Sequence, residues 1–235
     1  MPALQAPRKI SRRQELRQDA VVTVYARALD FYSRNKTYVL AAAAVLAVVI
    51  VGYVGYRFYL LRQGDEAARL LGPIVLMYEQ GNYQEALDGT VDQPGLLEIA
   101  KRYGQTKDGN LARFYAADAL YRLDRKEEAL EYFAAFDKGA DYLGAAAYAG
   151  QAAAHEDLGD QRRAAALYRE AALVYENKLT SPQYLLDAAR NFEAVGDYAA
   201  ARGAYQLISE RFPESEVAEG IEFYVTRLDA LQGRL

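Results

Sequence analysis

The chain has 235 residues, of which 52% are hydrophobic, so it can bury a substantial core. It contains no cysteine, which excludes disulfides, thiolate nucleophiles and cysteine-ligated metals. The formal net charge of −4 is divided unevenly, with +7 on residues 1–64 and −11 on residues 65–235. The acidic part is a poor candidate for binding nucleic acid, because that affinity rests on cationic side chains that meet phosphates.

The first 37 residues form a basic arm that ends in an apolar stripe at helical spacing. Val22, Tyr25, Leu29 and Tyr32 recur every three or four residues, which is typical of an amphipathic helix. Residues 19–37 are therefore predicted to form a juxtamembrane helix. It could lie on the inner leaflet of a membrane or dock on a partner membrane protein, and the stripe does not distinguish the two.

A membrane-spanning helix is predicted over residues 38–61. The nineteen residues from Tyr38 to Tyr56 carry no charge, and a span needs roughly 20 apolar residues. A buried core helix is the alternative, but no other segment could cover such a helix on all sides. A cleaved signal peptide fits less well, because the preceding stretch is too long and no A-x-A cleavage site follows promptly.

The flanking charges predict how this helix is oriented. Eight cations lie in the 37 residues before the uncharged run, whereas three, Arg57, Arg62 and Arg69, lie close behind it. The positive-inside rule then places the N-terminus in the cytoplasm. Residues 65–235 would form an extracytoplasmic domain.

A pattern recurs in the last third of the chain: residues 158–168 read LGDQRRAAALY and residues 195–205 read VGDYAAARGAY. The second stretch has the form of a helical hairpin corner. Gly196 can take the left-handed conformation that ends one helix, and Asp197 can cap the next. Pro213 would then stop the second helix.

Four such units can be registered by their corners. Each corner is followed five residues later by an alanine, and nine residues later by an aromatic residue in all but the first unit. The corners lie 43, 35 and 37 residues apart, and an insertion at residues 88–95 accounts for the longest interval. The corners are Gly81, Asp124, Gly159 and Gly196; the alanines are Ala86, Ala129, Ala164 and Ala201; the ninth positions are Thr90, Phe133, Tyr168 and Tyr205.

Helices are predicted to precede three of these corners, at residues 111–123, 145–158 and 184–195. A final helix at residues 216–231 would cap the stack, with Val217, Ile221, Tyr224 and Leu228 facing inward. The predicted fold is all-α: a single transmembrane helix, then about four helical hairpins and a C-terminal capping helix over residues 65–235.

The corner glycine, the small residue five positions later, the aromatic and the closing proline resemble the tetratricopeptide repeat, which implies an α-solenoid. The chain as a whole combines a basic arm, one span, an acidic array of repeats and an insertion that ends in YGQTKDGNLARFYAADALYRL. This arrangement resembles the membrane-anchored ancillary subunits of the SecYEG translocon, in versions from Bacteroidetes-like bacteria. That resemblance implies a bacterial inner-membrane protein with a periplasmic domain. It also implies that translocon subunits, periplasmic chaperones or exported clients are the partners, and an organiser of another envelope complex is the alternative.

In such an array the first helices line a groove that binds a protein segment. The aromatic and apolar members of the predicted lining could instead pack between neighbouring units. The predicted lining residues are Phe114, Asp118, Tyr121, Arg122, Ala149, Ala153, Glu156, Leu186, Arg190 and Glu193.

The chain is expected to have no enzymatic activity, cofactor, metal or small-molecule substrate. Its single histidine, His155, precedes Glu156 and Asp157, but successive helical residues do not face each other, so this is poor geometry for a catalytic dyad. A packing or capping role for His155 near a helix end is expected. The sequence contains no nucleophile elbow, P-loop or Rossmann glycine pattern.

Overall fold

The computed structural model describes residues 23, 25–27 and 29–232. Within them the chain is helical, and no β-strand occurs. The chain divides into two compact units between Tyr59 and Leu60. The prediction of an all-α chain is therefore confirmed for the described residues, whereas most of the predicted basic arm, residues 1–22, lies outside them.

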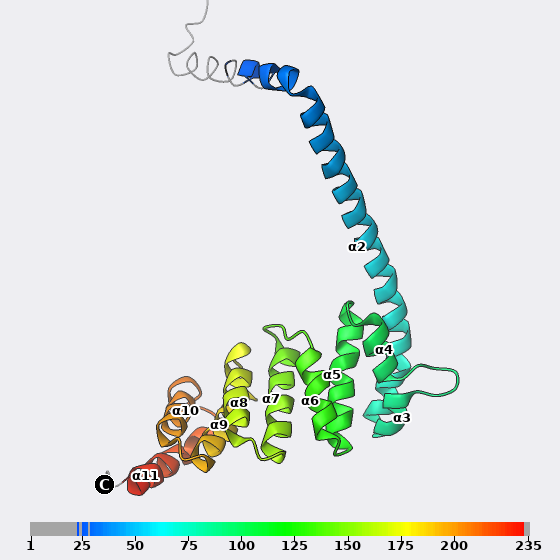
Figure 1. Ribbon diagram of the computed structural model, residues 1–235. Helices are drawn as coiled ribbons and strands as arrows, with labels where there is room; N and C mark the ends of the chain where they lie inside the picture. The colour runs from blue at the N-terminus through cyan, green and yellow to red at the C-terminus, as the bar shows by residue number, and fades with distance from the viewer. Residues whose placement is uncertain (1–22, 24, 28, 233–235) are drawn as a thin grey trace, which may run out of the picture. The chain divides into compact units, whose positions relative to one another are not determined.

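The described part of the first unit contains a short helix and the start of a very long one. Residues 25–27 and 29–34 are helical, the chain bends at Asn35, and helix α2 (Lys36–Glu79) follows (Figure 1). Among the described residues, α2 is the one helix long and apolar enough to cross a membrane, and none of its apolar window is buried. The length and composition predicted for a span at residues 38–61 are thus present.

Helix α2 does not end where the predicted span ends. It runs on to Glu79, through Pro73, so that the predicted span and the first array helix are one helix. The apolar residues Ala67, Leu71 and Ile74 continue at helical spacing beyond the uncharged run, and all three are buried in the second unit. The helical periodicity therefore persists although the composition changes from apolar to amphipathic.

The second unit is a row of helices that runs from cyan to red in Figure 1, and from α3 onward each α-helix packs against the next in chain order. We call residues 60–79 of α2 with α3 the first helix pair, α5 with α6 the second, α7 with α8 the third, and α9 with α10 the fourth. The helices are α3 (Tyr83–Asp88), α4 (Leu96–Tyr103), α5 (Lys107–Arg122), α6 (Lys126–Ala135), α7 (Tyr142–Asp157), α8 (Gln161–Val174), α9 (Ser181–Ala194), α10 (Tyr198–Arg211), the 3₁₀-helix η1 (Glu216–Gly220) and α11 (Ile221–Leu231).

The four predicted corners are confirmed. Gly81, Asp124, Gly159 and Gly196 have φ values of 83°, 62°, 85° and 74°, in the left-handed region. After each corner, the next backbone N–H donates to the carbonyl oxygen five residues earlier, at distances of 2.8–3.1 Å. This 6→1 bond is the Schellman closure, which satisfies a carbonyl that the helix end leaves unpaired. A single backbone device thus ends the first helix of every pair.

Small buried residues let the paired helices approach closely. The alanines five residues after the corners have no exposed surface. Seven residues before the corners lies a second set of residues with no exposed surface, which was not predicted. Small side chains at helix crossings shorten the distance between the axes. The second set consists of Ala117, Ala152 and Ala189, whereas the first pair has the larger Ile74 at the equivalent position.

The first helix pair departs from the other three at the predicted insertion. Helix α3 ends at Asp88, and an isolated bridge between Gly89 and Pro94 closes a loop at whose tip Val91 is fully exposed. Helix α4 then packs against α3 and α5. This additional helix was not predicted. Its buried face consists of Leu96, Ile99, Ala100 and Tyr103.

The C-terminal end follows the prediction closely. Helix α10 ends at Arg211, two residues before Pro213. The predicted helix at residues 216–231 is present, but its first five residues are the 3₁₀-helix η1. Ile221 and Leu228 are buried against the fourth pair, and the other two predicted inward residues, Val217 and Tyr224, are partly buried there.

Candidate protein-binding surface

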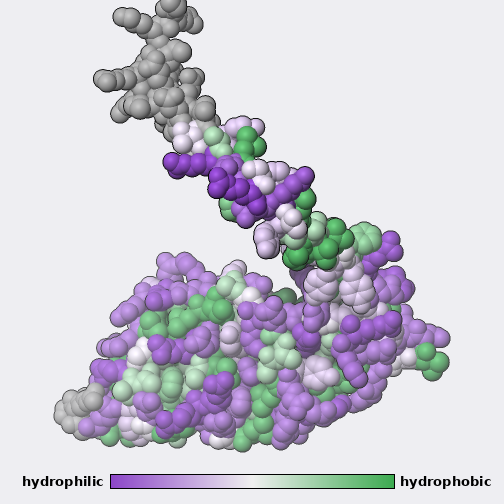
Figure 2. Space-filling model, turned by 45° about the horizontal axis from the view of Figure 1, so that its top comes forward, coloured by the Kyte–Doolittle hydropathy of each residue, from purple (hydrophilic) through white to green (hydrophobic). Residues whose placement is uncertain are grey.

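The predicted groove residues all lie on the first helices of their pairs. Phe114, Asp118, Tyr121 and Arg122 are on α5, Ala149, Ala153 and Glu156 on α7, and Leu186, Arg190 and Glu193 on α9. Their exposure differs widely, because neighbouring helices cover part of each face. Figure 2 shows that one face of the array mixes polar and apolar patches rather than being uniformly polar.

Three predicted groove residues belong to the packed interior. Ala149 is 9% exposed and lies in the core cluster of the third and fourth pairs. The Leu186 side chain is only 8% exposed and lies in the core of the fourth pair. The partly buried Phe114 ring meets the Phe133 and Phe136 rings at centroid distances of 6.3 Å and 5.6 Å. Such aromatic contacts stabilise a core through area burial and edge-to-face geometry. Phe114 and Leu186 therefore offer little area to a partner.

Asp118 is the centre of a polar cluster between the first and second pairs. It accepts a hydrogen bond from the Tyr78 hydroxyl on α2, and the Arg122 Nε lies 2.5 Å from it. The Arg122 guanidinium also lies over the Tyr83 ring, 5.4 Å from its centroid. Burial, and then the bond to Asp118, raise the pKa of Tyr78, so its hydroxyl stays a neutral donor.

Tyr121 links the second pair to the third. Its hydroxyl donates to an Asp157 carboxylate oxygen on α7 at 3.0 Å, and the Lys126 ammonium lies 3.6 Å from the same carboxylate. Lys126 also pairs at 2.5 Å with Asp124, the residue of the second corner. One ammonium group therefore contacts both Asp124 and Asp157. Because Asp157 is about two-fifths exposed, water screens the pairing.

Glu156 and Glu193, the two glutamates of the predicted lining, each accept a hydrogen bond from a tyrosine of the same helix pair. The Tyr168 hydroxyl donates to Glu156 at 2.9 Å, and the Tyr205 hydroxyl donates to Glu193 at 2.5 Å. Each tyrosine lies nine residues after its corner and each glutamate three residues before it. Glu193 also pairs with Arg227 on α11, which ties the fourth pair to the capping helix.

Asp187 on α9 lies beside the predicted groove residue Arg190, and it was not itself predicted. Gln183 donates to it at 3.0 Å, and Arg190 Nη1 lies 3.7 Å away. Burial raises the pKa of Asp187 more than Gln183 and Arg190 lower it, so these two neighbours only partly offset the cost of burying its ionised carboxylate. The helical spacing of Gln183, Asp187 and Arg190 was a usable signal, because side chains three and four residues apart share a face.

His155 lies at the C-terminal end of α7, partly buried, with its Nδ1 3.6 Å from an Asp160 carboxylate oxygen. Burial lowers its pKa, which favours the neutral imidazole. In the same place, Asp160 caps α8 by accepting a hydrogen bond from the Arg163 N–H at 3.2 Å. The geometry places His155 beside a helix corner.

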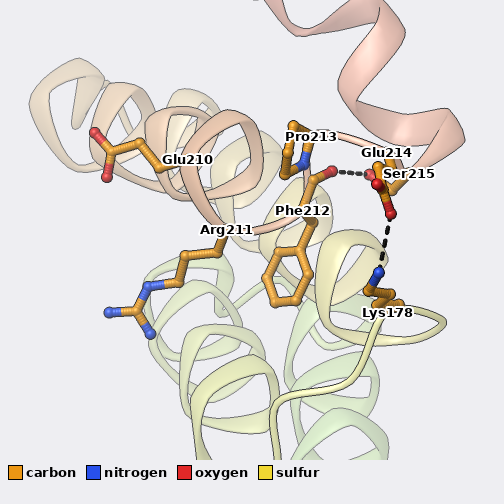
Figure 3. Close-up of a pocket in the computed structure, with 7 residues that line it drawn as sticks. All are labelled: Lys178, Glu210, Arg211, Phe212, Pro213, Glu214 and Ser215. Carbon is orange, nitrogen blue, oxygen red and sulfur yellow. Dashed lines mark hydrogen bonds and ion pairs between the residues drawn. The ribbon is translucent and has the colours of Figure 1, made fainter.

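A cleft of about 400 Å³ lies where α10 ends, and it was not predicted. In Figure 3 the Phe212 ring lies between the side chains of Arg211 and Lys178, which extend to opposite sides. Lys178 pairs with Glu214 at 2.9 Å, and Arg211 pairs with Glu176. Both cations of this cleft therefore have an ion-pair partner within the chain, although water screens these exposed pairs. Glu210, Pro213 and Ser215 complete its lining.

No protein-family model, curated protein or solved structure matches this chain.

The polar residues on the first helices are arranged as neighbouring donor–acceptor pairs rather than converging on one point. Such a surface can exchange hydrogen bonds with a partner at its rim, while the buried aromatic residues keep its shape. The predicted lining contains two cations, Arg122 and Arg190, and their side chains are each about half exposed.

Proposed function

We propose that this chain is a non-enzymatic, membrane-tethered adaptor that binds other proteins. In this proposal residues 65–235 are a tetratricopeptide-type α-solenoid of about four hairpins and a capping helix. The observation that carries it is the repeated corner: four left-handed residues, four Schellman bonds, and a buried alanine five residues after each. Stacked helical hairpins of this kind offer extended surfaces for protein segments.

The proposal places residues 38–61 across a bacterial inner membrane with the N-terminus in the cytoplasm. The length and apolar character of α2 support a span, and the excess of cations before it supports this orientation. The acidic array would then lie in the periplasm. Tethering would raise its effective concentration near other membrane-bound proteins, which strengthens their binding without any additional contact.

The resemblance to ancillary SecYEG subunits supports a role at the protein-export translocon, together with periplasmic chaperones and exported clients. The mixed surface of α5, α7 and α9 is the proposed binding site. Its two exposed arginines, and the partly buried Asp187 with its incomplete compensation, favour a partner segment that carries both signs of charge.

Photo-cross-linking in intact membranes tests this function. A photoreactive residue at Arg190, on α9, is compared with one at Arg169, which is also exposed but lies on α8. Cross-links from position 190 to translocon subunits or periplasmic chaperones, absent at position 169, support the proposal. Cross-links to another envelope complex would replace the translocon role with that of a scaffold. Equal labelling from both positions would contradict the proposed groove.

A second experiment tests the orientation. Because the chain has no cysteine, a single cysteine at Lys178, whose side chain is 82% exposed, can be labelled specifically. A membrane-impermeant thiol reagent should label it in cells with a permeabilised outer membrane and an intact inner membrane. Labelling only after the inner membrane is opened would reverse the topology.

A further inference from the structure

The helix that precedes α2 has a strongly sided surface. At about 100° per residue, Tyr25, Leu29 and Tyr32 fall within about 60° of one another around its axis. Arg27, Asp30 and Arg34 lie on the opposite side, and so does Phe31, an apolar residue that is 62% exposed. Tyr25 is 65% exposed and Leu29 is 49% exposed, so these apolar side chains are not covered within the described chain. A stripe of this kind requires an apolar surface to cover it.

Chain continuity limits where that surface can be. The helix ends at Asn35, whose backbone N–H donates to the Phe31 carbonyl at 3.0 Å, and α2 begins at the next residue. The uncharged run starts at Tyr38. Three residues at about 1.5 Å each place the end of the short helix within about 5 Å of the start of the span. An interfacial helix lies at about this depth.

The charges also match a membrane surface. Arg34 pairs with Asp30 at 3.0 Å, and with Arg27 and Lys36 included, residues 25–36 carry a net charge of +2. Anionic headgroups of the inner leaflet attract cations placed beside a span. From the stripe, the continuity with α2 and the charge, we propose that residues 25–34 lie in the plane of an anionic membrane surface, with Tyr25, Leu29 and Tyr32 toward the acyl chains.

The test uses the full chain, which contains no cysteine, in vesicles that contain anionic and zwitterionic lipids and no other protein. Fluorophores are attached to single-cysteine variants on the apolar side (Tyr25→Cys, Leu29→Cys, Tyr32→Cys) and on the polar side (Arg27→Cys, Asp30→Cys). Val48→Cys provides the reference within the span. Each is quenched by iodide from water and by brominated acyl chains from the lipid.

We expect labels at residues 25, 29 and 32 to be quenched by the brominated lipid, with iodide quenching several-fold weaker than at residues 27 and 30. The proposal rests on the proposed span, and residue 48 separates the two. Iodide access at residue 48 would refute the span. Deep burial there, with equal iodide access at all five other positions, would overturn only the interfacial helix. Protection from both quenchers would also overturn it, because a second copy of the chain would then cover the stripe.

Discussion

In the third and fourth helix pairs a tyrosine nine residues after the corner donates to a glutamate three residues before it, within the same pair. In the first and second pairs, Tyr78 and Tyr121 occupy the glutamate position and donate forward to the next pair. Thr90 and Phe133 replace the tyrosine after the corner. The same type of corner thus occurs with tyrosine hydrogen bonds within one helix pair and with tyrosine hydrogen bonds to the next pair.

The two halves also differ at the corner itself. Asp160 and Asp197 cap α8 and α10 by accepting from backbone N–H groups, at 3.2 Å and 3.1 Å. Asn82 and Arg125 occupy that position before α3 and α6 and make no side-chain cap. The later pairs therefore contain more of their own stabilising contacts. The earlier pairs depend more on their neighbours, as nearest-neighbour coupling in stacked arrays allows.

The largest expected effect is on the internally closed fourth pair. Tyr205 has no exposed surface, and Tyr205→Ala removes both its ring and its bond to Glu193. We expect the free energy of unfolding to fall by about 3–5 kcal/mol, as for other large-to-small core changes. Tyr205→Phe keeps the ring and should cost only about 1 kcal/mol. Urea unfolding of the detergent-solubilised chain measures both, and equal losses would show that the hydroxyl, not packing, dominates.

A smaller effect is expected where the second pair meets the third. A methyl group at Gly150 on α7 would collide with the buried Phe133 ring of α6, so Gly150→Ala should destabilise the chain by about 1–3 kcal/mol. Gly203 on α10 has open space around it. Gly203→Ala is the matched control and should stabilise by about 0.5–1 kcal/mol through helix propensity. A gain in stability for both variants would contradict the tight junction.

The corners should respond to substitution with opposite signs. Gly159→Ala forces a side chain into the left-handed region and should cost about 1 kcal/mol. Asp124→Gly relieves the one non-glycine left-handed residue in the described chain and should stabilise by about 0.5 kcal/mol. Thermal melts of the two variants and the parent chain test this. A loss on Asp124→Gly would mean that the contact with Lys126 outweighs the backbone strain.

A comparably small effect is expected on the alkaline limb of stability. Burial, and then the bond to Glu193, raise the pKa of Tyr205 above its ordinary value of 10. Between those two pKa values the folded state holds a proton that the unfolded state has released, so this stability is present below pH 10 and is lost as the pH rises above it. At pH 10.5 the loss should be just under about 1 kcal/mol. Tyr205→Phe should reduce the slope of the limb between pH 9 and 10.5 in denaturant titrations, and an unchanged slope would contradict the assignment.

The sequence anticipated the features that depend on local conformation. A corner needs a residue that tolerates positive φ, and glycine and aspartate are visible as letters, so all four corners were predicted. The first helices begin earlier than predicted, at Lys107, Tyr142 and Ser181 instead of residues 111, 145 and 184. Thr106 and Asp141 cap the first two through their side chains, and these polar residues precede the apolar spacing on which the prediction relied.

The features that were missed depend on residues far apart in the chain. Tyr78 and Asp118 are 40 residues apart, and nothing in either local pattern indicates that they meet. Helix α4 was missed because its eight residues follow a loop rich in turn formers, where an insertion was predicted. Whether the row of helices is a tetratricopeptide solenoid, and whether α5, α7 and α9 bind a partner, stay predictions.

The loop after α3 also offers a place to attach a reporter. Its base is fastened by Thr90 and Gln93, each of whose backbone N–H groups donates to the other residue's carbonyl, while Val91 at the tip touches nothing. Exposed loop tips tolerate insertion better than any helical position. A short epitope or fluorogenic tag placed between Thr90 and Gln93 would therefore make the protein visible in living cells while leaving every helix intact.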